Sequence, residues 1–132
     1  RHAWERVVVP AAARFQPDLI LVSAGYDAHF MDPLGSMQLT TAGYGWLGSQ
    51  LSQLSQQLCG GRLVCVLEGG YHCESLGASV IATLQGMAYS PMSLSDLECD
   101  QVSGEDVIKW LQPEPLGKVE AVLDQVVRLH GL

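Results

Sequence analysis

The segment LILVSAGYDAH, residues 19–29, decides the fold of this chain. It opens with four consecutive apolar residues that follow a break at Pro17. A continuous apolar run bounded by turn signals is typical of a strand that is buried on both faces of a parallel sheet. A second run of this kind, LVCVL at residues 63–67, continues directly into EGGY at residues 68–71. The sequence therefore predicts two buried parallel strands, each followed by a loop of small and polar residues.

Helices are predicted before, between and after these strands. Apolar residues recur every three or four positions from Tyr44 to Leu58, which predicts an amphipathic helix that Thr40 or Thr41 caps and a Gly-Gly pair ends. Further helices are predicted at residues 3–15, with a kink or restart at Pro10, at about 74–89, at about 107–111 and at about 116–129. This alternation predicts an α/β fold with a parallel sheet and helices on both faces.

The chain is expected to be part of a larger domain. Two strands are fewer than the roughly five or six of an average sheet. Charged residues make up only 16% of the 132 residues, compared with roughly 25% in an average soluble protein. Both observations predict that the chain packs against an N-terminal half of the same domain that lies outside this sequence.

Composition argues against several classes of function. The net charge is −7 and no basic cluster is visible, so direct binding of nucleic acid is not expected. No apolar run reaches the roughly 18 residues of a membrane span. The four cysteines include no C-x-x-C pair, which favours free thiols in a reducing compartment. We therefore expect a cytoplasmic protein, or a nuclear one in a eukaryote.

The candidate functional residues lie just beyond the two predicted strands, at the edge where open α/β sheets bind their ligands. If the strands are neighbours, Asp27 and Tyr71 face the same crevice. Asp27 is either a turn or helix-cap carboxylate or a metal ligand. The Asp-x-His spacing to His29, with Asp32 close by, would suit zinc, iron or manganese. Three ligands in so short a stretch would be crowded, so not all three are expected to bind one ion.

Tyr71 is open to two interpretations. It is either a core tyrosine after a tight turn or a phenol that points into a cleft and donates a hydrogen bond to a developing oxyanion. Gly69 and Gly70 precede it, and glycine allows unusual backbone angles and a close approach of the backbone to a substrate. The residues alone leave both interpretations open.

Two blocks of the sequence resemble a known family. Residues 23–29 (SAGYDAH), followed by DPLG, LT and GY up to position 44, resemble the third conserved block of class II-type histone deacetylases. They also resemble the bacterial relatives of these enzymes, the acetylpolyamine amidohydrolases and acetoin-utilisation proteins. Residues 67–71 (LEGGY) resemble the family's catalytic-tyrosine block.

The resemblance covers about residues 1–90, and the residues beyond show none. It implies part of the three-layer arginase/deacetylase fold. Residues 1–90 would form the C-terminal half of the catalytic domain, and residues 91–132 an irregular segment and a helix that pack on it.

The resemblance also implies a role for each candidate residue. Asp27 corresponds to the third zinc ligand and Tyr71 to the phenol that stabilises the oxyanion. Leu34 corresponds to an apolar wall residue of the acyl-lysine channel, and Gly69 and Gly70 line that channel near the metal. Two further ligands, an Asp and a His, and a histidine general base belong to the missing N-terminal half. The implied reaction is zinc-dependent hydrolysis of N-acyl amides on lysine side chains or polyamines.

His29 bears on two alternatives: that it is itself a metal ligand, and that the chain is a ureohydrolase. By resemblance to the deacetylases it is not a ligand. The manganese ureohydrolases of the same fold carry a block that resembles Asp-x-Asp-x-x-Asp-Pro here. A histidine in place of the second carboxylate removes negative charge that two adjacent cations need, so a single zinc ion is predicted and Asp32 is assigned to organising the loop. Because two ligands and the base are missing, a non-catalytic or incomplete fragment that acts as an interaction module is the alternative function.

Overall fold

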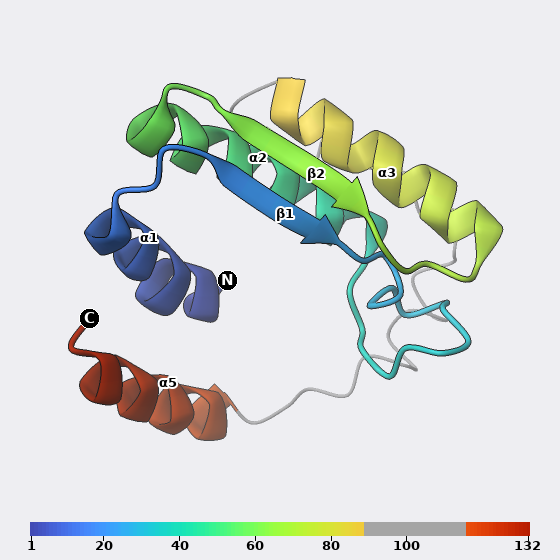
Figure 1. Cartoon of the computed structure of the whole chain (residues 1–132). Helices are drawn as coiled ribbons and strands as arrows, with labels where there is room; N and C mark the ends of the chain where they lie inside the picture. The colour runs from blue at the N-terminus through green and yellow to red at the C-terminus, as the bar shows by residue number, and fades with distance from the viewer. Residues whose placement is uncertain (89–115) are drawn as a thin grey trace.

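The structure, a computed structural model of the chain, describes residues 1–88 and 116–132 (Figure 1). The short helix predicted at about 107–111 and the irregular segment around it lie outside these residues. The described elements follow in the order η1 (Trp4–Val8, π-helical), α1 (Val9–Phe15), β1 (Ile20–Ala24), α2 (Thr41–Cys59), β2 (Leu63–Leu67), α3 (Cys73–Ala88) and α5 (Leu116–His130).

The two strands form a parallel pair. Residues Ile20 to Ala24 of β1 pair in register with Leu63 to Leu67 of β2, and α2 connects the two strands. The pairing continues past the strand ends, because the Glu68 N–H donates to the Ala24 carbonyl at 3.1 Å. Both strands therefore end at the same edge of the sheet. This confirms the parallel arrangement predicted from the sequence and brings the two following loops together.

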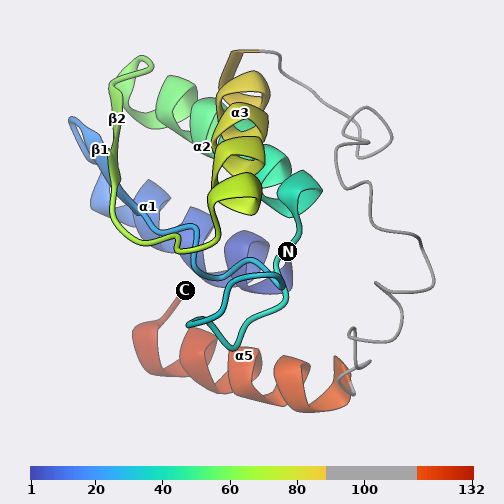
Figure 2. The same ribbon diagram turned by 90° about the vertical axis from the view of Figure 1, so that its right-hand side faces the viewer.

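The helices α2 and α3 lie on the same face of the strands (Figure 2). Val22, Ala24 and Cys65 point towards these helices. Leu21 and Val64 are exposed on the opposite face, Leu21 to 67%. No helix within residues 1–88 and 116–132 covers that face. Within residues 1–88 and 116–132 the strands are therefore covered on one face only, and the second helical layer of the predicted fold is not among these described elements.

Small residues let α2 and α3 approach closely. A Cβ on Gly48 would overlap the carbonyl of Thr83, and a Cβ on Gly86 would overlap the carbonyl of Gly45. The Ser52 hydroxyl donates to a carbonyl of α3 at 3.1 Å across the same interface. The two helices are thus in backbone contact, which fixes their relative position with little freedom to adjust.

Local signals place the ends of the helices as predicted. Thr40 Oγ1 accepts the Gly43 N–H at 3.1 Å and caps α2, and Gly60 ends this helix with a left-handed φ of 59°. Pro10 stands in the first turn of α1, directly after the π-helical η1. Because proline has no N–H to donate, the hydrogen-bonding pattern changes at this point, as the predicted restart requires.

The C-terminal helix α5 lies beside η1 and α1 (Figures 1 and 2). Arg6 of η1 forms ion pairs with Glu120 and Asp124 of α5. At the other end of the helix, Arg14 Nη1 donates to the carbonyl of His130 at 2.8 Å. Among the described helices, none combines the length and the hydropathy that crossing a bilayer requires.

Candidate active site

Two loops meet beyond the carboxyl ends of β1 and β2. One loop follows β1 over residues 25–40, and the other follows β2 over residues 68–72. The Tyr26 N–H donates to the Gly69 carbonyl at 2.8 Å, so the contact between the strands extends into the loops. The structure thus brings together the two segments that the sequence predicted to share one crevice.

The carboxylate of Asp27 lies between the two loops. A Cβ at position 69 would stand 2.9 Å from Asp27 Oδ2, and a Cβ at position 25 would stand 2.9 Å from Oδ1, so both glycines pack directly against the carboxylate. Asp27 is partly exposed, and no group within the described residues donates a hydrogen bond to its carboxylate. A carboxylate placed by backbone packing in this way is open to a cation.

Asp32 joins the two loops through backbone hydrogen bonds. Its Oδ1 accepts the N–H groups of Leu34 (2.9 Å) and Gly35 (3.1 Å), and its Oδ2 accepts the Tyr71 N–H at 2.7 Å. Burial raises the pKa of Asp32, but the backbone N–H groups of Tyr71, Leu34 and Gly35, and also that of nearby His72, lower it by more, so this pKa lies below its ordinary value. The bonds within its own loop confirm the organising role predicted for Asp32. The bond to Tyr71 was not predicted.

The side chains of Tyr71 and Leu34 extend from these loops and are 58% and 71% exposed. Gly70, just before Tyr71, has a φ of 135°, and a Cβ there would stand 2.8 Å from Leu76 Cδ1. The turn therefore requires glycine. Within the described residues Tyr71 is not a core side chain, and its phenol is accessible to a ligand.

His29 is buried within the loop after β1. Its Nδ1 accepts the Met31 N–H at 3.2 Å, so the proton resides on Nε2, which lies 3.2 Å from Thr41 Oγ1 and donates to it. The ring stacks on Phe30 with centroids 4.7 Å apart. Both ring nitrogens are engaged inside the protein, which supports the expectation that His29 is not a metal ligand.

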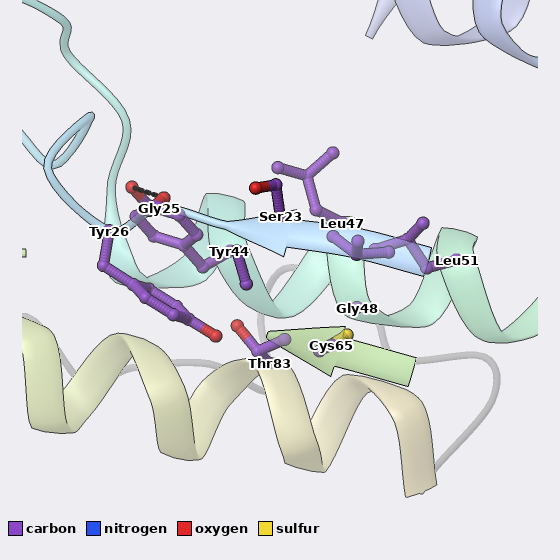
Figure 3. A pocket seen from close by; sticks show the side chains of 11 residues that line it. Ser23, Gly25, Tyr26, Tyr44, Leu47, Gly48, Leu51, Cys65 and Thr83 are labelled. Carbon is purple, nitrogen blue, oxygen red and sulfur yellow. Dashed lines mark hydrogen bonds between the residues drawn. The ribbon is translucent and has the colours of Figure 1, made fainter. Parts of the chain in front are cut away.

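Tyr44 contacts the candidate site, although the sequence placed it only on the apolar stripe of a helix and at the end of the block that resembles the family, without a role in the site. Its hydroxyl donates to the Gly25 carbonyl at 3.3 Å (Figure 3), and its ring packs on Tyr26 with centroids 4.8 Å apart. Burial and then the nearby charge of Asp27 raise the pKa of Tyr44 to about 12. The neutral phenol thus ties α2 to the backbone that carries Asp27. Two signals in the sequence pointed to it: its place at the end of the block of residues 23–44, and its polar-tipped aromatic side chain on an otherwise aliphatic stripe.

A cavity of about 130 Å³ lies behind these loops, between the strands and the helices (Figure 3). No charged residue lines it, and neither Asp27 nor Tyr71 reaches it. Its wall is mainly apolar and comes from both strands and from α2 and α3, with Val22, Ala24, Leu47, Leu51 and Cys65 among the contributors. The Asp27 carboxylate and the Tyr71 phenol therefore belong to a different surface from this cavity.

Asp27 fits one position of a zinc site but does not complete one. Catalytic zinc sites take three protein ligands from His, Cys, Asp and Glu and leave one position open. Within residues 1–88 and 116–132, no cluster of three or more such side chains is placed to hold a metal ion. His29 and Asp32 are already bound to the protein itself. A complete site thus needs ligands from beyond the described residues.

Comparisons with known proteins extend these observations. Residues 1–87 match the family model of the histone deacetylase domain. Over its whole length the chain is 41% identical to "Histone deacetylase 10, chloroplastic" of Oryza sativa subsp. japonica, of which it covers 28%. Over 89 residues, 67% of the chain, it is 46% identical to "Polyamine deacetylase HDAC10" of Homo sapiens and covers 13% of that protein. The chain spans less than a third of the length of these relatives.

The solved structures agree on the fold. The HDA15 HD domain is 40% identical over 70% of this chain and 25% of its own, with a TM-score of 0.56. The histone deacetylase Clr3 is 38% identical over 65% of this chain and 14% of its own, with a TM-score of 0.57. These likenesses confirm the predicted α/β arginase/deacetylase fold. The match to the rice protein also covers the residues beyond position 90, for which the sequence had shown no resemblance.

Proposed function

Because this chain belongs to the histone deacetylase family, we propose that it supplies one part of a zinc-dependent deacylase active site, with Asp27 as a metal ligand and Tyr71 as the oxyanion donor. The observation that carries the proposal is the place of the Asp27 carboxylate. It lies against Gly69, two residues before Tyr71, and has no hydrogen-bond donor within the described residues. A cation held by Asp27 would therefore sit beside the loop that carries the accessible phenol.

The proposed reaction is the hydrolysis of an N-acyl amide. A bound zinc ion supplies Lewis-acid polarisation of the acyl carbonyl. The Tyr71 hydroxyl donates a hydrogen bond to the carbonyl oxygen and strengthens that bond as negative charge develops there. Donors of this kind are worth on the order of 3–4 kcal/mol in the transition state. The Tyr71 N–H donates to Asp32, and this bond holds the backbone from which the phenol extends.

The proposed substrates are acylated primary amines, either lysine side chains of proteins or polyamines. Relatives of both descriptions, histone deacetylases and a polyamine deacetylase, resemble this chain. Leu34, Gly69 and Gly70 would line the channel for the acyl-bearing chain, since Leu34 presents an exposed apolar side chain and both glycines are partly exposed beside it in the facing loop. The net charge of −7 favours the approach of cationic substrates.

The rest of the site would come from residues outside the described part of the chain. Asp27 provides one ligand, so two more and a general base must be added. The alternative function, a non-catalytic interaction module of the same family, is favoured by the absence of a complete ligand cluster among the described residues.

The test uses the complete protein that contains this chain. Tyr71→Phe should lower kcat for an acetyl-lysine peptide or an acetylpolyamine by about 100-fold or more while zinc content stays at the wild-type level. Asp27→Asn should lower zinc content itself, measured by elemental analysis. Asp18→Asn, a change at an exposed carboxylate before β1, is the matched control and should alter neither quantity.

Three outcomes would count against the proposal. Near-normal turnover by Tyr71→Phe removes the phenol from the mechanism. Full zinc occupancy in Asp27→Asn removes the carboxylate from the metal site. A wild-type protein that neither retains zinc nor releases acetate supports the interaction module instead.

A further inference from the structure

Asp32 occupies an unusual position between the two loops of the site. The residue is 7% exposed, and its two carboxylate oxygens point to different segments of the chain. Oδ1 accepts the backbone N–H groups of Leu34 and Gly35 in its own loop, and Oδ2 accepts the N–H of Tyr71, which is 39 residues away in sequence. We propose that Asp32 is a positioning residue that sets the place of the Tyr71 phenol relative to Asp27 and Leu34. This inference rests on the proposed function.

A simple turn role does not account for this geometry. A carboxylate that only organises a turn accepts bonds from N–H groups two or three residues ahead, as Oδ1 does here with Leu34 and Gly35. In this chain the second oxygen makes the shortest of the three bonds, 2.7 Å to the Tyr71 N–H. Charge-assisted hydrogen bonds of this length are among the stronger ones, and a buried location strengthens them further.

Within the part of the chain that the structure describes, few other features fix the position of Tyr71. Its side chain is 58% exposed, and the residue follows two glycines, of which Gly70 has a φ of 135°. Within the described residues, the bond to Asp32 is the one hydrogen bond that Tyr71 makes. The position of the Tyr71 Cα, and with it the starting point of the phenol, therefore depends on Asp32.

The same carboxylate also holds the proposed channel wall. Leu34 donates its N–H to Oδ1 of Asp32, so Leu34 and Tyr71 are both attached to one buried group. A shift of Asp32 would move both residues together relative to Asp27. Positional errors of about 1 Å at a catalytic group can lower rates by about 100-fold.

The first experiment is a double-mutant cycle in the complete protein, with Asp32→Asn and Tyr71→Phe. Asparagine keeps the shape of Asp32 but turns an N–H₂ group towards one of the backbone N–H donors. Asp32→Asn should lower kcat by about 10- to 100-fold with KM changed less than about 3-fold. In the Tyr71→Phe background the same change should lower kcat by less than about 2-fold, because residues that act through one another are not additive.

Two measurements separate positioning from general loss of structure. Zinc content and the thermal midpoint are compared with those of Asp18→Asn, an exposed carboxylate whose loss leaves both loops intact. Hydrogen exchange of the Tyr71 amide should be slow in the wild type and faster in Asp32→Asn. A residue with a purely structural role would lower kcat equally in both backgrounds of the cycle.

A second variant leaves Asp32 in place, in case Asp32→Asn does not fold. Incorporation of the α-hydroxy analogue of tyrosine at position 71 replaces the Tyr71 N–H by an ester oxygen and removes only this donor. The bonds of Asp32 to Leu34 and Gly35 remain, and kcat should fall with little change in KM. If the ester variant turns over at the wild-type rate, or if the cycle is additive, Asp32 does not position Tyr71. Suppose that Tyr71→Phe loses activity, but the ester variant is fully active or the cycle is additive. The positioning role of Asp32 is then wrong, while the proposed function of Tyr71 stands.

Discussion

The carboxylate of Asp27 lies directly against the Cα of Gly69, so that a Cβ at position 69 would stand 2.9 Å from Asp27 Oδ2. The contact links the loop after β1 to the loop after β2 at the centre of the candidate site. It is a contact between a side chain and a backbone, and a Cβ at position 69 cannot be accommodated unless the carboxylate moves.

Gly69→Ala should therefore weaken zinc binding by the complete protein, by about 10-fold or more, the usual range for changes that displace a ligand indirectly. Competition with a chelator of known affinity measures this. Gly77→Ala is the matched control, because Gly77 lies on the exposed side of α3 with nothing within 4 Å of an added Cβ. That control should stabilise the helix by up to about 1 kcal/mol and leave zinc affinity unchanged. Equal zinc affinities for the two variants would contradict the proposed role of the contact.

Tyr44→Phe should destabilise the protein by about 1 kcal/mol, the usual value of one neutral hydrogen bond. The change removes the bond from the hydroxyl to the Gly25 carbonyl, which lies two residues before Asp27. Zinc affinity should fall as well, because the backbone that carries Asp27 loses its tie to α2. Urea unfolding and metal titration measure the two effects. A stable variant with unchanged zinc affinity would show that the packing of the ring alone holds the loop.

The same tyrosine predicts a pH dependence. Its pKa in the folded protein, about 12, lies above the ordinary value of 10.0, so the folded state holds the phenol proton more tightly than the unfolded state. The resulting stabilisation is complete below pH 10 and is lost as the pH rises towards 12. In a titration of phenolate absorbance, Tyr44→Phe should lack the step at highest pH. Retention of that step in the variant would assign it to another of the four tyrosines.

Gly86→Ala should destabilise the fold by about 1–3 kcal/mol, the usual effect of overpacking. The new methyl group would overlap the Gly45 carbonyl and stand 3.0 Å from the Ser49 backbone nitrogen. The midpoint of denaturant unfolding measures the change, and Gly77→Ala on the same helix serves again as the control. If both alanine variants unfold at the same denaturant concentration, α2 and α3 are not packed as tightly as the structure places them.

The sequence predicts those features that depend on neighbouring residues. The apolar runs at residues 19–22 and 63–67 predict the strands, and Thr40 and Gly60 mark the ends of α2, because capping and strand formation act over a few positions. The sequence also predicts that Asp27 and Tyr71 share one edge, since parallel strands end together. Their roles in catalysis stay predictions.

The features that the sequence did not predict depend on distant partners. The spacing of apolar residues along α2 would include Tyr44 whether or not its hydroxyl bonds to Gly25. The sequence pattern therefore does not predict that bond. The bond from Tyr71 to Asp32 joins residues 39 positions apart. The exposure of one face of the strands has a related cause. An apolar run signals burial in the whole domain, whereas the described elements cover one side.

The ion pairs between η1 and α5 bear on the order of folding. Arg6 meets Glu120 and Asp124 across 114 and 118 residues, whereas the paired residues of β1 and β2, such as Ile20 and Leu63, are 43 residues apart. Closing the longer loop has the greater entropic cost, so we expect the unit from β1 to α3 to assemble first and α5 to dock on it afterwards. During synthesis on the ribosome, η1 can then form its ion pairs with α5 only after residues 116–130 have emerged.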